Sequence, residues 1–195
     1  MVDVKEIEIN KIRNFSYKLS RNFTVVNKNA VLCFNGKMSD VWREQDNYYN
    51  IGGIDNKVIF KNFNSYLFSI YGKYNAVLDK ILLYASDTKA VFDSMIGCEI
   101  DKVTEMHRKI DIARLCGNMD IMFQIPNAVD YLLQLSLSDD EVVLSSDICL
   151  CFEESLSRDI CIIRRKMFDN VEAVKKDTEI NIKYTGTGNL LILPS

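Results

Sequence analysis

Two stretches of the sequence repeat the same order of features, and such a repeat restricts the fold more than any local pattern does. In both, a β-branched run is followed by a segment with helical spacing that contains Tyr-Leu, and then by a strand-like segment that ends in Ser-Asp. The match requires two small gaps, so chance similarity between two β-α-β segments is the alternative. The matched stretches are 58–70 (VIFKNFNSYLFSI) with 79–87 (DKILLYASD), and 121–135 (IMFQIPNAVDYLLQL) with 140–147 (DEVVLSSD).

Hydrophobic periodicity places helices along this repeat. Apolar residues at helical spacing predict helices over Ile9–Arg21 and Phe63–Tyr71, and a third from Asp101 to about Ile110. Residues 111–117 fit a helix or a strand equally well, and both interpretations stay open. The sequence therefore predicts an α+β fold of two similar antiparallel sheet-plus-helix units. Domain 1 would span residues 1–100, and a shortened domain 2 would span residues 101–195.

Short runs of β-branched and aromatic residues between polar turns predict the strands. Three pairs of runs have hairpin spacing: 23–26 with 30–34, 148–153 with 159–166, and 179–184 with 189–193. The last pair would turn at Gly186-Thr187-Gly188. Further strands are expected at 2–9, 57–61, 80–85 and 89–95.

The predicted helix Ile9–Arg21 has a basic face without a carboxylate, in a chain whose formal net charge is −3. A positive surface on an acidic protein favours binding of a phosphate backbone. An ordinary solvated surface is the alternative explanation of such a face. A second basic cluster surrounds His107. The candidate DNA-binding residues are Lys11, Arg13, Asn14, Lys18, Arg21, Arg108, Lys109 and Arg114.

The composition predicts a soluble, intracellular protein with a sizeable core, since 48% of its 195 residues are hydrophobic. No apolar run reaches the ~20 residues of a membrane span, and the charged N-terminus is unlike a signal peptide. The six cysteines lie mostly in apolar segments, which is typical of reduced core residues. Asn, Ile, Lys and Tyr are abundant, as in AT-rich genomes, including viral ones. A viral protein would act in the host cytoplasm or nucleus.

No motif indicates catalysis, a metal or a cofactor. The single histidine, His107, has no nucleophile motif beside it. Cys149-x-Cys151 lacks zinc-knuckle spacing, and strand alternation would place both thiols on one face. Gly186-x-Gly188 is not followed by the helix that a phosphate-binding loop requires. Asp139-Asp140-Glu141 is more typical of a solvated loop than of a cation site. The sequence therefore predicts a binding protein and not an enzyme, with no cofactor.

The C-terminal stretch TEINIKYTGTGNLLILPS and the stretch KVIFKNFNSYLFSIYG, followed by KILLYASD and KAVFDSMIG, carry a family resemblance. They resemble the strand, helix and hairpin units of DNA sliding clamps, the polymerase processivity factors of the proliferating-cell nuclear antigen and T4-like phage type. The resemblance covers most of the chain loosely. The chain is shorter than a two-domain clamp protomer, so the second domain would be abbreviated.

This resemblance implies a homo-oligomeric ring, closed by pairing of edge strands, around duplex DNA. The candidate basic residues would line the hole and hold phosphates without sequence specificity. The ring would tether a DNA polymerase or another replication or transcription protein. The partner-binding residues carried over from the family are Leu190, Leu191, Ile192, Leu193, Pro194 and Ser195.

A second hypothesis is a non-enzymatic viral or phage accessory protein that binds and modulates a host or viral protein. It rests on the aromatic residues Trp42, Tyr48 and Tyr49, which stand in a polar stretch. Such a protein could also dock through an exposed sheet edge.

Overall fold

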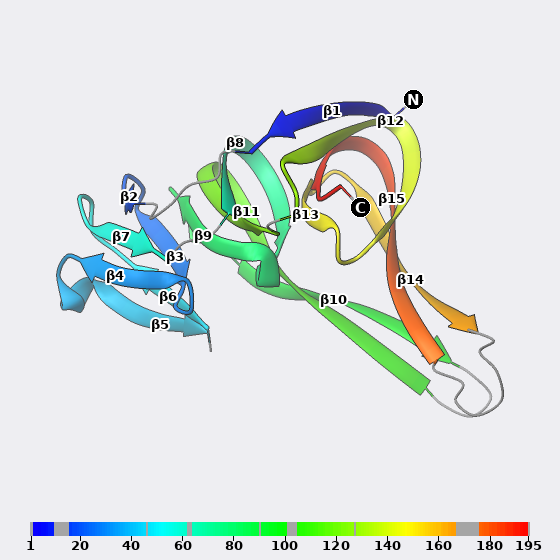
Figure 1. The fold of residues 1–195 in the computed structure, drawn as a ribbon, viewed down its shortest axis with the longest axis horizontal. Coiled ribbons are helices and arrows are strands. Elements are labelled where there is room, and N and C mark those ends of the chain that lie inside the picture. The colour runs from blue at the N-terminus through cyan, green and yellow to red at the C-terminus, as the bar shows by residue number, and fades with distance from the viewer. Residues whose placement is uncertain are drawn as a thin grey trace.

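The computed structural model describes residues 2–9, 16–45, 47–61, 64–89, 91–100, 105–126, 128–166 and 176–194 (Figure 1). Most residues in these ranges lie in β-strands, and every strand pair is antiparallel. The helical elements there are two short 3-10 turns, η1 (Met38–Asp40) and η2 (Leu78–Lys80), and no α-helix is present in the same ranges. The expected α+β fold is therefore wrong, because this part of the chain is an antiparallel β structure.

Fifteen strands follow one another along the described chain. They are β1 (Asp3–Glu8), β2 (Ser16–Lys18), β3 (Phe23–Asn27), β4 (Val31–Asn35), β5 (Val41–Gln45), β6 (Tyr48–Ile51), β7 (Lys57–Phe60), β8 (Asn64–Val77), β9 (Ile81–Ser86), β10 (Val91–Ile100), β11 (Glu105–Ile125), β12 (Tyr131–Ser145), β13 (Cys149–Glu153), β14 (Ser157–Lys166) and β15 (Lys176–Ile192).

The predicted helices are wrong wherever the structure describes them. β8 pairs with β11 along its whole length, from Asn64 opposite Ile125 to Val77 opposite Ile112. These cross-strand partners outweigh the helical spacing of a few apolar residues. The predicted helical segments lie in β2 (residues 16–18), β8 (64–71) and β11 (105–110), while residues 10–15, 63 and 101–104 lie outside the described ranges. Residues 111–117, whose sequence fits a helix or a strand, also belong to β11.

The strands form three consecutive units with one topology. We call residues 16–60 unit 1, residues 64–125 unit 2 and residues 131–192 unit 3. In each unit the last strand pairs with the first strand on one side, and with the two middle strands end to end on its other side. In unit 1 the first strand is divided into β2 and β3 and the last into β6 and β7, with the same pairings.

The second strand of every unit contains one residue more than the stretch with which it pairs, which makes a β-bulge. A turn of three residues precedes this strand each time, at 28–30, 78–80 and 146–148. The sequences around the bulge are similar: VLCF in β4, ILLY in β9 and CLCF in β13. The extra residues are Leu32, Leu82 and Leu150.

The predicted repeat differs from these units in number and in part of its alignment. Tyr66 and Tyr131 both stand near the start of a first strand, β8 and β12. Ser86 ends β9, whereas Ser146 lies between β12 and β13, so these two serines are not equivalent. The predicted domain boundary at residue 100 falls between β10 and β11, which pair with each other over their full common length.

The three predicted hairpins are also wrong, although most of their strands exist. β3 and β4 do not pair with each other, and β13 and β14 both pair with β15. Residues 179–192 form part of the single strand β15, which continues through Gly186 with a φ of 116°. The predicted partners instead pair with the last strand of their unit: β3 with β6, β4 with β7, and β13 and β14 with the same side of β15. Adjacency in sequence does not reveal these pairings.

The units lie side by side, and each junction joins the first strand of one unit to the second strand of the next. β3 pairs with β9, and β8 pairs with β13. A buried apolar cluster fills each junction. The hairpins β10–β11 and β14–β15 extend as two adjacent arms that point away from unit 1 (Figure 1). β1 adds a strand to the outer edge of β12.

Candidate strand-binding groove

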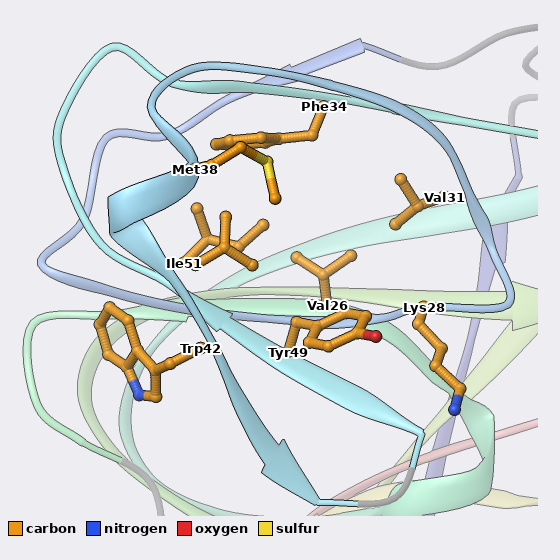
Figure 2. A pocket seen from close by; sticks show the side chains of 9 residues that line it. Val26, Lys28, Val31, Phe34, Met38, Trp42, Tyr49 and Ile51 are labelled. Carbon is orange, nitrogen blue, oxygen red and sulfur yellow. The ribbon is translucent and has the colours of Figure 1, made fainter.

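An open apolar groove of about 430 Å³ lies in unit 1, at the end of the molecule opposite the arms (Figures 1 and 2). Its floor is the sheet β3–β6–β5, and its roof is β4 with η1. Two sheets pack face to face here, because the small sheet β2–β7–β4 covers one face of the floor. The residues that line the groove are Val26, Lys28, Val31, Phe34, Met38, Val41, Trp42, Tyr49 and Ile51.

The indole of Trp42 stands at one end of the groove (Figure 2). It is 44% exposed and lies over Gly52, where an added Cβ would be 3.3 Å from the ring. Met38, in the roof, is 74% exposed. Single exposed apolar side chains are common, but apolar side chains gathered on one concave surface are typical of an interaction site. The groove therefore presents an apolar surface that the described part of this chain leaves open.

Only two of the three aromatic residues noted in the sequence belong to this surface. Trp42 and Tyr49 line the groove, whereas Tyr48 is buried and points to the other face of the sheet. The Tyr48 hydroxyl donates a hydrogen bond to the main-chain oxygen of Leu78. Burial, together with the nearby charge of Asp79, raises the pKa of this phenol. Strand alternation explains the division, since consecutive residues point to opposite faces.

The groove occupies the place that the junction core occupies in unit 2. Six of its lining residues have equivalents in unit 2, and all six equivalents are buried in one cluster. That cluster is completed by Val25 and Tyr48, which unit 1 contributes from its first and last strands. The equivalent pairs are Val26 and Ala76, Lys28 and Leu78, Val31 and Ile81, Phe34 and Tyr84, Tyr49 and Ala113, and Ile51 and Leu115.

The outer edge of β4 also differs from the outer edges of its equivalents, β9 and β13. Among the described strands β4 pairs only with β7, whereas β9 and β13 each pair with a strand on both sides. Leu32 is 59% exposed and Cys33 is exposed, while Leu82 and Leu83 in β9 are buried. An apolar edge strand with an unpaired side is a template for a further strand.

Among the predicted DNA-binding residues that the structure describes, some form ion pairs with carboxylates and the others lie in the β10–β11 hairpin. Lys18 lies 2.7 Å from Asp55, and Arg114 forms an ion pair with Asp93. Arg108 and Lys109 stand in β11, opposite Gly97 and Ile96 in the arm. Lys11, Arg13 and Asn14 lie outside the described residues.

Arg21 belongs to a polar cluster that holds unit 1 against unit 2. Its guanidinium lies 3.7 Å from Asp87 and 3.9 Å from Asp120, and it donates a 2.9 Å hydrogen bond to Asn118. Asp120 also accepts a 2.9 Å hydrogen bond from the hydroxyl of Tyr17. Asn118 and Arg108 are ten residues apart in β11, which is roughly 33 Å along an extended strand. The structure therefore does not bring Arg21 close to the basic residues of the arm.

The predicted partner-binding segment lies inside the sheet. Leu190, Leu191 and Ile192 are buried in β15 between β12 and β13, and Leu193 is buried just beyond it. Pro194 is partly buried, and Ser195 lies outside the described residues.

The two cysteines of β13 lie in different cores, so the expectation of a shared face is wrong. The bulge at Leu150 reverses the alternation between them. Cys149 packs in the cluster of Phe152 and accepts a hydrogen bond from Tyr184, whereas Cys151 joins the cluster of the preceding junction. Burial raises the pKa of the Cys149 thiol to about 12.

The described ranges contain no group of three or more side chains arranged to hold a metal ion. Within the same ranges, no helix is long and apolar enough to span a membrane.

No protein-family model and no curated protein matches this sequence. The crystal structure of protein SPYM3_0169 from Streptococcus pyogenes is similar to this structure, with a TM-score of 0.61 and 8% sequence identity. The match covers 100% of this chain and 94% of that chain. At this level of identity the likeness shows a shared fold alone.

Sequence reasoning missed the groove and the free edge of β4. A signal was present in the three related runs VLCF, ILLY and CLCF, which mark the second strand of each unit. Alignment on these runs would have indicated three units, of which unit 1 is the first along the chain. Such an alignment would not have revealed the groove, which lies where units 2 and 3 each receive a strand from the preceding unit.

Proposed function

We propose that this chain is a binding protein that takes up an extended apolar segment of another polypeptide. The segment adds a strand to the free edge of β4 and places apolar side chains in the groove of unit 1. Strand addition of this kind obtains affinity from main-chain hydrogen bonds and specificity from pockets for alternate side chains.

One observation carries the proposal: the chain fills the equivalent place in unit 2 with a strand of its own. There β3 pairs with the outer edge of β9, and Val25 enters the buried cluster. Burial of one side chain the size of valine or leucine contributes roughly 1.5–3 kcal/mol. One or two such residues would therefore contribute roughly 1.5–6 kcal/mol to binding, in addition to the main-chain hydrogen bonds that the segment makes along β4.

The DNA-binding hypothesis stays a prediction. Three of its described cations, Lys18, Arg21 and Arg114, are paired with carboxylates. The groove therefore supports a protein-binding function better than these cations support a nucleic-acid function.

Trp42 makes the proposal directly measurable, because it is the single tryptophan of the chain and lines the groove. The probe is a synthetic peptide that carries the sequence of Phe23–Asn27 with a threonine at each end. Binding should bury the indole and shift its emission to shorter wavelength, with saturation as the peptide concentration rises.

Two exposed positions provide a matched pair of variants. Met38→Glu places a charge in the groove, and Ile54→Glu places one on a residue that is 67% exposed and does not line the groove. The first variant should lose the emission shift and the second should keep it. An emission spectrum that the peptide leaves unchanged, or an equal response of both variants, would rule out the groove as a strand-binding site.

A further inference from the structure

We infer that the polypeptide which fills the groove is a second copy of this chain, bound through the outer edge of its β12. This inference rests on the proposed function and names its partner. The contact would be head to tail. Unit 3 of one copy would pack against unit 1 of the next copy, in the way that unit 1 packs against unit 2 within the chain.

The two internal junctions share one register, and that register defines the new contact. Val25 stands two residues before the end of β3 and pairs with Tyr84, and Asn75 stands two residues before the end of β8 and pairs with Phe152. Val143 has the same place in β12. The equivalent of Tyr84 and Phe152 in unit 1 is Phe34. In the second copy, therefore, Val143 would lie opposite Phe34, and Leu144 opposite Cys33.

The edge of β12 is open where this register requires it. β1 covers β12 only from Tyr131 to Ser136, and no other described strand pairs with that edge. Val143 is 52% exposed, whereas its equivalents Val25 and Asn75 are buried. β12 of unit 3 and β4 of unit 1 therefore expose residues whose equivalents are buried at the two internal junctions. Terminal repeats of an array need a cap or a neighbour for this reason.

Charge distinguishes the copy-to-copy contact from its internal counterparts. Each internal junction has a base on the first strand's side and an acid on the other: Arg21 with Asp87 at 3.7 Å, and Lys73 with Glu154 at 3.8 Å. At the two free ends of the array the signs are reversed, with an acid on β12 and a base beyond β4.

Continuing the register past the end of β4 at Asn35 places Asp140 of β12 opposite Lys37. Lys37 would repel Lys73 or Arg21 if β4 met the edge of another unit. The reversed pair therefore attracts the correct edge and penalises the wrong ones, which is how many specific interfaces select a partner.

A contact between different surfaces of identical subunits continues until it closes into a ring or grows into a filament. Disulfide trapping tests this property. Antiparallel residues directly opposite each other have Cβ atoms about 4.5–5.5 Å apart, close enough for a disulfide after a small adjustment. In Leu144→Cys, the new thiol should cross-link to Cys33 of the next copy under mild oxidation.

The expected product is a ladder of covalent multimers on a non-reducing gel, with peptide mapping that joins position 144 to Cys33. Adding Cys33→Ser to Leu144→Cys should abolish the ladder, and Val4→Cys, on exposed β1, should give none. A protein that stays monomeric, or a dimer that persists without Cys33, would overturn the inference.

A charge exchange tests the register without a cross-link. Lys37→Glu and Asp140→Lys should each weaken association about tenfold in analytical ultracentrifugation, the ratio for a change near 1.4 kcal/mol. The double variant should restore it. Equal association of all four proteins would overturn the contact. If the peptide binds the groove but neither experiment detects association, the second-copy inference fails and the proposed function stands. Failure of peptide binding and of association together would remove both.

Discussion

The hydroxyl of Tyr48 in unit 1 donates a hydrogen bond to the main-chain oxygen of Leu78, in the turn before the second strand of unit 2. Both residues are buried in the apolar cluster between the two units. Unit 1 thus completes the core of unit 2 with a large side chain whose polar end is satisfied there. In unit 1, the position equivalent to this core is the open groove.

Tyr48 should therefore be important for the stability of the first junction. Tyr48→Phe removes the hydrogen bond and should lower the free energy of unfolding by about 0.5–1.5 kcal/mol. Tyr48→Ala also removes the ring and should cost about 3–5 kcal/mol. Urea unfolding monitored by circular dichroism measures both values. Tyr49→Phe, one residue away in the groove, is the control and should cost little. Equal effects of Tyr48→Phe and Tyr49→Phe would contradict the role of this hydrogen bond.

Gly117 is required by the backbone of β11. Its φ is 95°, at the point where β11 changes partner from β10 to β9. Gly117→Ala should destabilise the protein by about 1–3 kcal/mol, because a side chain is strained in that conformation. Cys116→Ala, at the exposed neighbouring position, should have an effect below about 0.5 kcal/mol. Thermal unfolding compares the two variants, and similar melting temperatures would argue against backbone strain at residue 117.

The close approach of Trp42 to Gly52 predicts a spectroscopic change. In Gly52→Ala the new methyl group would stand 3.3 Å from the indole, so the ring must move by a few tenths of an ångström or more. The emission maximum should shift without peptide, and peptide binding should weaken. Stability should change little, because the indole is at the surface. An unchanged emission spectrum would show that the indole does not rest on Gly52 in solution.

Cys149 should make stability depend on alkaline pH. Burial raises the pKa of its thiol from 9 to about 12, so between these values the unfolded chain loses the proton and the folded chain keeps it. The contribution is fully present below pH 9 and is lost as the pH rises towards 12. Tyrosines also titrate in this range, so the useful quantity is the difference between wild type and Cys149→Ala.

Urea unfolding at pH 8, 9 and 10 measures that difference. The stability advantage of the wild type over Cys149→Ala should shrink as the pH rises. A difference that is independent of pH would contradict a buried, protonated Cys149.

Several strands could be predicted from local sequence, because β-branched and aromatic runs favour extended backbone wherever they pair. The runs at β3, β4, β7, β9, β13 and β14 were expected close to where they lie. β8 and β11 were not, since Leu67 and Ile70, or Met106 and Ile110, have helical spacing as well. Only pairing over their common length separates the two interpretations.

The candidate site could be predicted only in part. Trp42 and Tyr49 were noted as aromatic residues in a polar stretch, and both line the groove. Met38, Phe34 and the free edge of β4 were not noted, because nothing in their local sequence differs from a buried strand. Leu32 and Leu82 occupy the same position of their units, yet one is exposed and the other is buried.

The sequence by itself determined that this chain is apolar enough to form a substantial core, and it carries three copies of a strand motif with leucine at the bulge. Only the tertiary structure decided which copies are covered. The second strand of each unit pairs at its inner edge with the last strand of the same unit. Its outer edge can be covered only by a strand of another unit, which lies far away in the chain. β9 and β13 have such neighbours, and β4 has none among the described residues. The same local sequence therefore forms a core in two units and an open groove in the first.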